Sequence, residues 1–304
     1  MATEIRDLTG APGSLGLYAR AAAPMVPGAS LLPFVGGRGS ESPDLELRMQ
    51  GVRVDSEDLP RYTRACGFRL ADTLPSTYIH VLAFPLHMAL MTDASFPFPV
   101  VGLVHVENRI VQRRPVHVDE ALSLRVRATP VEPHPKGRQF TIVSEAYVGD
   151  ELVWEDFSTN LRFGGGSATE QPKDPKRRKA APPVHATWKL DGGLGRRYGA
   201  ASGDRNPIHM HDLSAKLFGF PRAIAHGMWT KAHCLAALEG RLPSAYEVEV
   251  AFKKPILLPA TVTFGSESAA KDGTRFSVRS EEDAPHLDGT VRPLRNTPGQ
   301  RKKS

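Results

Sequence analysis

Hydrophobic and polar residues alternate along four stretches in the first half of the chain, at 103–110, 122–127, 140–147 and 152–162. Alternation with a period of two predicts half-buried β-strands, and the Pro, Gly and Asp residues between these stretches predict turns. An apolar segment of helical character, 84–91, precedes the first strand. A helix followed by hairpin-connected strands has to bury its apolar stripe against one face of the sheet, so the pattern predicts an α+β fold.

The second half of the chain repeats landmarks of the first half in the same order. Three pairs of residues carry this repeat: Met88 and Met228, Pro115 and Pro255, and Phe140 and Phe276. The first two pairs are 140 positions apart and the third is 136 positions apart. Landmarks that keep their order and spacing predict an internal duplication, with one helix-and-sheet unit in each half.

Length and composition are typical of a globular protein with two cores. The chain has 304 residues, of which 40% are hydrophobic and 24% are charged. The longest apolar stretch, 81–91, contains Pro85 and His87 and is far shorter than the roughly 20 residues that cross a bilayer. No secretory signal is readable, so we expect a cytoplasmic protein. Cys66 and Cys234 are too few for a disulfide framework, and we expect both to be reduced packing residues.

The net charge of +6 is concentrated in segments whose composition predicts flexibility. Basic residues cluster at 173–179 and at 292–302, so a solvated linker and tail explain much of the excess, and nucleic-acid binding is not expected. A positive surface can still attract the phosphates of coenzyme A or the acidic helix of an acyl carrier protein. The chain is therefore predicted to consist of a domain at 1–163, a flexible basic linker at 164–183, a domain at 184–292 and a basic tail at 293–304.

A carboxylate, an amide and an imidazole fall within six positions of the segment 198–209, as Asp204, Asn206 and His209. Pro207 disfavours the helical conformation for Asn206, and Ser-Gly-Asp is turn chemistry, so we expect a fixed loop here and not a regular helix. A carboxylate and an imidazole that face one space can hold and deprotonate a water molecule. The same residues also suit an ordinary turn, in which they bond only to nearby backbone groups.

A second part of the candidate site is Ala-His-Gly-Met at 225–228, in which Gly227 comes 18 positions after His209. It opens a segment with apolar residues at helical spacing. Gly227 is then expected in the first turn of a buried helix. Its N–H would be accessible at the positive end of the helix dipole, which suits an oxygen that gains negative charge. His226, directly before it, is expected to make one structural hydrogen bond.

These residues resemble the signature of the MaoC-like, (R)-specific enoyl hydratase and dehydratase family of hotdog-fold proteins. That signature is an aromatic residue, Ser/Thr-Gly-Asp-x-Asn-Pro-hydrophobic-His and a later Ala-His-Gly-Met, and it is matched over 198–228. The resemblance implies that Asp204 and His209 are the catalytic pair and that Gly227 supplies the thioester-binding amide. It also sharpens the predicted fold to a double hotdog, in which the two sheets join as in a dimer of single hotdogs.

The first half lacks the chemistry of the second. Its segment 62–70, ahead of the helix, has no Asp-x-Asn-Pro-x-His, and the spacing of 140 places His87 at the position of Gly227. We therefore expect a non-catalytic N-terminal hotdog domain that helps to complete the cleft and a catalytic C-terminal one.

The resemblance implies a reversible reaction between a (3R)-3-hydroxyacyl thioester and a trans-2-enoyl thioester, without a cofactor. Ser202 and Asn206 are expected to brace the loop. The sequence is compatible with coenzyme A or acyl carrier protein as the carrier of the thioester. It is also compatible with a monomeric double hotdog or a homodimer. Two alternatives remain: a hotdog thioesterase, which His209 beside Asp204 disfavours, and a non-catalytic acyl-binding protein, which only the degenerate first half supports.

The remaining histidines are expected to have structural roles, and some of the basic residues are expected to bind the carrier. A metal site is not expected, because no pair of histidines has the i, i+4 spacing of a helical zinc site among His209, His211, His226 and His233. Four histidines of the first half lie among apolar residues and are expected to be satisfied core or edge residues: His80, His87, His105 and His117. Three basic residues are expected near the cleft, where they would meet the carrier: Arg222, Lys253 and Lys254.

Overall fold

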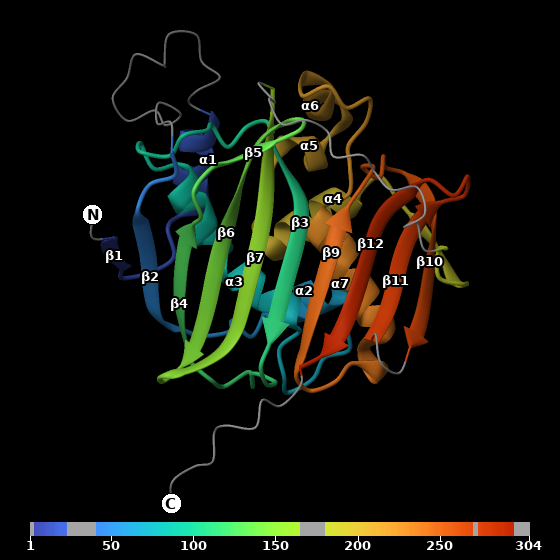
Figure 1. Ribbon diagram of the computed structural model, residues 1–304, viewed down its shortest axis with the longest axis horizontal. Coiled ribbons are helices and arrows are strands. Elements are labelled where there is room, and N and C mark those ends of the chain that lie inside the picture. Colours follow the sequence, from blue (N-terminus) through green and yellow to red (C-terminus); the bar gives the residue numbers. More distant parts are fainter. Residues whose placement is uncertain (1–2, 23–40, 165–179, 270–272, 295–304) are drawn as a thin grey trace, which may run out of the picture.

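The computed structural model describes residues 3–22, 41–164, 180–269 and 273–294. Long strands form one curled sheet, and helices α2, α3 and α7 lie behind it in the view of Figure 1. The first half contains β1 (Glu4–Leu8), α1 (Ser14–Ala22), β2 (Leu45–Val52), α2 (Asp58–Cys66), α3 (Ser76–Met91), β3 (Leu103–Gln112), β4 (Leu122–Ala128), β5 (Glu132–His134), β6 (Gly137–Val148) and β7 (Glu151–Phe163). The second half contains β8 (Val184–Leu190), α4 (Leu194–Ser202), α5 (Pro207–Met210), α6 (Asp212–Leu217), α7 (Gly227–Leu238), the 3₁₀ turn η4 (Glu239–Arg241), β9 (Tyr246–Phe252), β10 (Ala260–Ala269), β11 (Gly273–Ser280) and β12 (Pro285–Pro293).

Within the described residues, twelve strands belong to one sheet, in the order β1-β2-β4-β6-β7-β3-β9-β12-β11-β10-β8, with β5 paired to β6. The two halves join where β3 pairs with β9 in antiparallel register, with Arg109 opposite Glu249. Only the pairing of β1 with β2 is parallel among these strands. The α+β prediction is confirmed, and each of the four predicted strands of the first half is found, within β3, β4, β6 and β7.

Helix α3 is buried along most of its length because apolar residues occupy nearly all of its faces. Tyr78, Ile79, Leu86 and Leu90 are each at most 1% exposed, and each removes one large side chain from water. Full burial of such a side chain contributes roughly 1.5 to 3 kcal/mol. The helix begins eight residues earlier than the predicted segment 84–91 and continues through Pro85.

The two halves repeat the same contacts with two different spacings. A single antiparallel bridge joins Thr73 to His117 just before α3, and its counterpart joins Ile224 to Leu257 just before α7. His117 and Leu257, the partners on the strand side of these bridges, are 140 positions apart, which is also the spacing of Pro115 and Pro255. Thr73 and Ile224, the partners on the helix side, are 151 positions apart. The backbone repeat is therefore real, but one spacing does not hold along the whole unit.

The correspondence of His87 with Gly227 is wrong for this reason. At the helix-side spacing of 151, Gly227 corresponds to Ser76, and each of these residues opens its helix. His87 lies near the other end of α3. The first half has a longer helix, of 16 residues against 12, and a longer connection to the next strand, which shifts the register of the two helices.

Other features of the chain were not visible in the sequence pattern or lie outside the described residues. The first strand of each unit, β2 or β8, and the helix after it, α2 or α4, were not predicted. Cys66 and Cys234 are buried free thiols, as expected. Every helix in the described ranges is too short or too polar to cross a membrane. Most of the predicted linker, 165–179, and nearly all of the tail, 295–304, fall outside the described residues.

Candidate active site

The segment that carries the candidate catalytic residues begins as a helix. Helix α4 ends at Ser202, and Gly203 follows in the left-handed conformation with a φ of 74°, donating its N–H to the carbonyl of Gly199. The prediction that 198–209 is not helical is therefore wrong for 198–202, where Tyr198 is buried on the inner face of α4, and for 207–209, which belong to the short helix α5. The turn that follows, 203–206, is the loop that was expected.

Helix α5 and its cap position His209. Asn206 is the N-cap, with its Oδ1 accepting from the N–H of Ile208 at 3.4 Å, and Pro207 occupies the first helical position. The His209 ring is only 8% exposed, and its Nδ1 lies 2.8 Å from the backbone oxygen of Ile224. A carbonyl only accepts, so Nδ1 carries the proton and Nε2 keeps its lone pair. Burial outweighs the nearby Asp204 carboxylate and lowers the pKa of His209.

Asp204 lies on the turn between α4 and α5 with its side chain 29% exposed. Its Oδ1 accepts from the N–H of Asn206 at 3.1 Å, and its own N–H donates to Ser202 Oγ at 3.2 Å. Burial acts to raise the pKa of Asp204, but His226, His209 and the Asn206 N–H outweigh it and keep that pKa below its ordinary value. Ser202 and Asn206 both contact the turn at Asp204, and their loop-bracing role stays a prediction.

His226 holds the two parts of the site together. Its ring stacks on His209 with 3.7 Å between the ring centroids, and its Nε2 donates to the backbone oxygen of Asp204 at 2.9 Å. The structural hydrogen bond expected of His226 is therefore confirmed. Its Nδ1 is buried without a partner in the part of the chain that the structure describes. Burial lowers the pKa of His226 to about 3, so the ring is neutral at physiological pH.

Gly227 is the first residue of α7, so its N–H has no intrahelical acceptor and lies at the positive end of the helix dipole. A Cβ at this position would lie 3.0 Å from the ring of Phe252, which explains why a small residue occurs here. Asp204, His209, His226 and Gly227 all line the same cavity. The structure thus brings together the residues that the sequence singled out.

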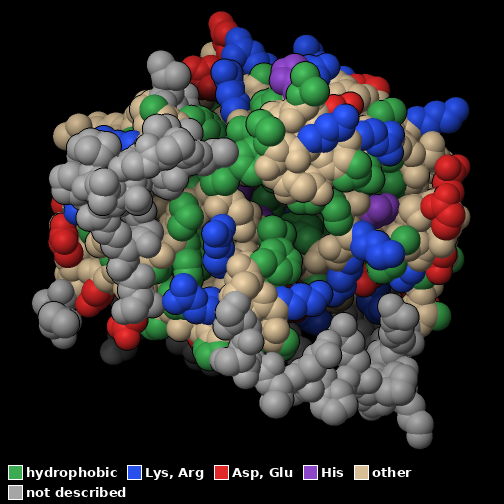
Figure 2. All heavy atoms as spheres, turned by 90° about the horizontal axis from the view of Figure 1, so that it is seen from above, with side chains coloured by type: hydrophobic (Ala, Val, Ile, Leu, Met, Phe, Trp, Pro, Cys, Tyr) green, Lys and Arg blue, Asp and Glu red, His purple; other side chains and the backbone are tan. Residues whose placement is uncertain are grey.

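The cavity has a volume of about 390 Å³ and is built from both halves of the chain. Figure 2 shows its mouth as a hollow with hydrophobic side chains inside and Lys and Arg side chains around it. Helix α3 contributes Phe84, Met88 and Met91 to the wall. Lys253 and Lys254 line the cavity as predicted, whereas Arg222 is exposed and is not among its lining residues.

Tyr18 is a part of the site that the sequence did not indicate. It projects from α1, lines the cavity, donates its hydroxyl to the Gly203 backbone oxygen at 2.9 Å and accepts from the N–H of Arg205. It therefore clamps the backbone on both sides of Asp204. No motif surrounds Tyr18, and a contact across 185 positions leaves no trace in local pattern.

Among the residues that the structure describes, two groups of side chains have a spacing that a metal ion requires. Asp204, His209 and His226 offer ligand atoms within 4.8 Å of one another, and so do His80, His87 and Asp156. In the first group one nitrogen of each ring already meets a backbone oxygen, which leaves a single nitrogen per ring for an ion. The expectation of a metal-free site stays a prediction.

Comparison with known proteins decides the family. The model of the "MaoC like domain" matches residues 176–286. The 3-hydroxyacyl-thioester dehydratase X of Mycobacterium tuberculosis is 38% identical over 269 residues, which cover 88% of this chain and 95% of that protein. The chain belongs to the MaoC-like dehydratase family. A crystal structure of the M. tuberculosis protein, HtdX, superimposes with a TM-score of 0.73 at 36% identity over 82% of this chain and all of that one.

Membership of the MaoC-like dehydratases confirms the resemblance read from the motifs at 198–228, and the superposition confirms the hotdog-type fold. A MaoC-like dehydratase from Phytophthora capsici shares this fold at 17% identity, with a TM-score of 0.69 over 83% of this chain and 95% of that one. The family model covers the second half of the chain, in which the candidate residues lie. The individual roles of Asp204, His209 and Gly227 stay predictions.

Proposed function

We propose that this protein is a 3-hydroxyacyl-thioester dehydratase that interconverts (3R)-3-hydroxyacyl and trans-2-enoyl thioesters. The observation that supports this most is the convergence of three groups on one cavity: the Asp204 carboxylate, the His209 imidazole and the first N–H groups of α7. A base, an acid and an oxyanion donor around one space are what reversible addition of water across an activated double bond needs.

In the hydration direction, water held by Asp204 and His209 attacks C3 of the enoyl thioester. One proton of that water passes to the pair as the C3–O bond forms, and C2 receives a proton from the pair, so no proton is gained or lost overall. After the attack on C3 and before the protonation of C2, the electron pair of the double bond lies toward the thioester oxygen, as in an enolate. The Gly227 N–H stabilises that oxygen, a contact whose loss costs roughly 3 to 4 kcal/mol in comparable sites.

The protonation states of His209 and Asp204 suit these roles. His209 donates through Nδ1 to the Ile224 carbonyl, so its Nε2 is the atom that accepts a proton. Its lowered pKa keeps the ring neutral at physiological pH, and the lowered pKa of Asp204 keeps the carboxylate ionised beside it. A neutral base next to a carboxylate that can stabilise the imidazolium is a suitable pair for moving one proton.

The carrier, the location and the assembly belong to the same proposal. Lys253 and Lys254 at the cavity can meet the phosphates of coenzyme A or the phosphopantetheine of an acyl carrier protein. We place the enzyme in the cytoplasm, with a non-catalytic N-terminal domain whose α3 forms one wall of the acyl site. Because β3 and β9 join two hotdog units in one chain, a monomer already contains both walls.

Enzyme assays test the proposal directly. Purified protein should hydrate crotonyl-CoA or a longer trans-2-enoyl thioester, followed by loss of the enoyl absorbance, with an enoyl acyl carrier protein tested in parallel. Asp204→Asn and His209→Ala should each lower kcat by at least a hundredfold, while Asp150→Asn, in the exposed turn between β6 and β7, should not. Release of free thiol without hydration would identify a thioesterase instead. Activity lost to a chelator and restored by a metal ion would contradict the expected absence of a cofactor.

A further inference from the structure

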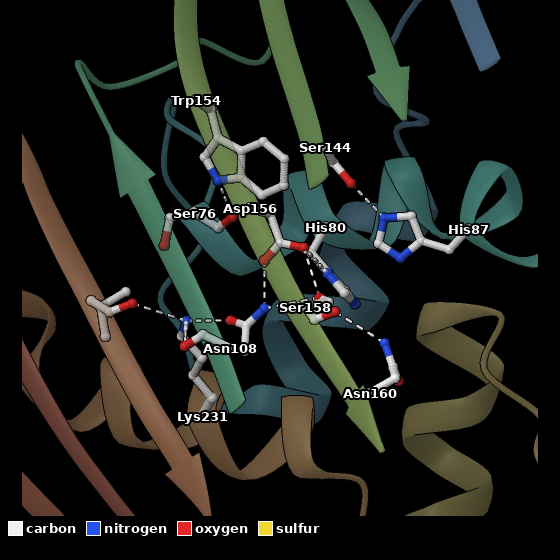
Figure 3. A network of polar contacts seen from close by, with 11 residues as sticks. Ser76, His80, His87, Asn108, Ser144, Trp154, Asp156, Ser158, Asn160 and Lys231 are labelled. Carbon is white, nitrogen blue, oxygen red and sulfur yellow. Dashed lines mark hydrogen bonds and ion pairs between the residues drawn. The ribbon is translucent and has the colours of Figure 1, made fainter. Parts of the chain in front are cut away.

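A second cluster of polar side chains lies in the first half, against the same cavity (Figure 3). At its centre is Asp156, which is fully buried on β7. The carboxylate accepts from His80 Nδ1 at 3.0 Å, from Ser158 Oγ at 2.9 Å and from Asn108 Nδ2. Such a fully satisfied carboxylate is held in one orientation, and it fixes His80 with Nε2 as the remaining ring nitrogen.

Lys231 closes the far side of this cluster. It reaches across from α7, is fully buried, and donates to Asn108 Oδ1 and to the backbone oxygen of Val248 at 3.3 Å. Burial lowers the pKa of Lys231 to about 7 although the Asp156 carboxylate opposes the shift. Lys231 therefore compensates the charge of Asp156 from the far side of the cluster, through Asn108. These hydrogen bonds connect the two halves of the chain. On the cavity side, these hydrogen bonds leave His80 Nε2 unused, whereas Ser158 Oγ already accepts from Asn108 Nδ2 at 3.0 Å and Asn160 Nδ2 donates to the Ser158 backbone oxygen at 3.0 Å.

Five members of the cluster or its surroundings form part of the cavity wall: His80, His87, His105, Ser158 and Asn160. The Nε2 of His105 is buried and has no hydrogen-bond partner within the described ranges. Burial lowers the pKa of His87 to about 3 and that of His105 to about 4, so both rings are neutral. The expectation that the first-half histidines are satisfied is thus wrong for His105.

A plain alkyl chain does not match this wall. Phe84, Met88, Met91 and Ile142 already offer an apolar surface for methylene groups. Seating methylenes against His105 and His80 would leave their polar nitrogens without water or a partner, which costs about 1 to 3 kcal/mol for each unsatisfied group. A hydroxyl group on the chain would remove that cost, because it can donate to a ring nitrogen. A carboxylate would not, because the Asp156 charge would lie close to a second, uncompensated negative charge.

We propose that the patch formed by His80, His105, Ser158 and Asn160 binds a hydroxyl group on the acyl chain, beyond the carbons that react. The substrate class is then acyl thioesters that carry an additional hydroxyl group, and not only plain fatty acyl chains. This inference rests on the proposed dehydratase function and concerns its specificity. The polar patch recognises the distal hydroxyl group while Asp204 and His209 act on C2 and C3.

The test compares matched substrates in one assay. Trans-2-enoyl-CoA thioesters of equal chain length, either plain or carrying a hydroxyl group at successive positions from C5 outward, are hydrated by the wild-type enzyme. At least one hydroxylated substrate should exceed its plain counterpart in kcat/KM by about tenfold or more, because a site with built-in polar groups rejects an analogue that lacks the matching hydroxyl group. The ratio of the two kcat/KM values is the readout.

Variants tie this ratio to the patch. His105→Phe should bring the ratio close to one, whereas His105→Gln, whose side-chain amide can still accept a hydrogen bond, should retain most of it. His117→Phe, at an exposed position, should leave the ratio unchanged. Circular dichroism and thermal unfolding check that each variant is folded. Equal turnover of plain and hydroxylated substrates at every position overturns the inference, as does a preference that survives His105→Phe. Turnover of the plain substrate reports separately on the proposed dehydratase function.

Discussion

The α-carbon of Gly195 lies against the backbone carbonyl of His209, so closely that a Cβ at residue 195 would be 1.9 Å from that oxygen. Gly195 is in the first turn of α4 and His209 is in α5, so this contact sets how closely the two helices approach. A backbone atom cannot turn aside as a flexible side chain can. The position of the imidazole in the cavity therefore depends on a glycine 14 residues earlier.

Gly195→Ala should consequently disturb the site without touching any side chain in it. We expect the free energy of unfolding to fall by about 2 kcal/mol and kcat/KM to fall at least tenfold, because α5 has to move away to make room for the methyl group. Gly192→Ala is the matched control, since a Cβ there meets nothing within 4 Å. Unfolding by urea and hydration assays measure both effects. Wild-type activity in Gly195→Ala would show that His209 does not need this packing.

The pH dependence of activity should reflect the burial of His209. Its pKa is lowered from the ordinary 6.5, and the proposed mechanism needs the neutral ring. Activity is then full above pH 6.5 and is lost as the pH falls through the lower folded-state pKa. We expect the acid limb of kcat/KM for hydration to have its midpoint below 6.5. A midpoint above 7 would mean that a different group, or a differently placed histidine, is the base.

The stability of the protein should fall in mild acid for a related reason. Burial lowers the pKa of His87, His105 and His226 to about 3, 4 and 3. Between pH 6.5 and about 4 the unfolded chain binds protons at these residues that the folded chain does not, so folding stability is complete above pH 6.5 and decreases below it. Each histidine contributes up to about 1.4 kcal/mol per pH unit in that window.

Urea unfolding at pH 7 and pH 5 measures this decrease. His105→Phe should unfold with a smaller difference between the two pH values than the wild type, because one buried titrating group is gone. His117→Phe should not change the difference, since that side chain is exposed. Identical midpoints for the wild type at pH 7 and pH 5 would rule out the neutral burial of these rings.

The sequence pattern predicted the parts of the fold that depend on neighbouring residues in the chain. The strands of the first half were found because alternation reflects a sheet with one buried face, and Pro115 and Pro255 kept their spacing because the paired strands β3 and β9 have a fixed register. The helix correspondence failed because Met88 and Met228 share a spacing without sharing a place in their helices. Ser76, the true counterpart of Gly227, becomes visible only through the bridges beside it.

The site was predictable where a motif carries it and not where tertiary contacts complete it. Asp204, Asn206 and His209 lie within six positions, so the sequence alone identified them as a group. Tyr18 and the polar patch reach the cavity from elements far away in the chain. The Ser-Gly-Asp turn chemistry predicts a loop that in the structure begins only at Gly203, because the burial of Tyr198 keeps the preceding residues in helix α4 and the left-handed conformation of Gly203 ends that helix.

The role of the Gly227 N–H can be isolated because Gly227 is the first residue of α7. Proline is favoured at that position of a helix and removes only a donor that has no intrahelical partner. His226 before it already has an extended backbone, with φ −66° and ψ 136°, as a residue preceding proline requires. The change that deletes the proposed oxyanion donor is therefore compatible with the fold.

Added atoms at residue 227 would meet Phe252, so the comparison is made in a Phe252→Leu background. There, Gly227→Ala adds a Cβ and keeps the N–H, and we expect kcat to change by less than about fivefold. Gly227→Pro should lower kcat by about a hundredfold to a thousandfold, the usual effect of losing one oxyanion donor. The ratio between these two variants measures the N–H itself, since both carry a Cβ. Equal kcat values for alanine and proline would assign the thioester oxygen to another donor.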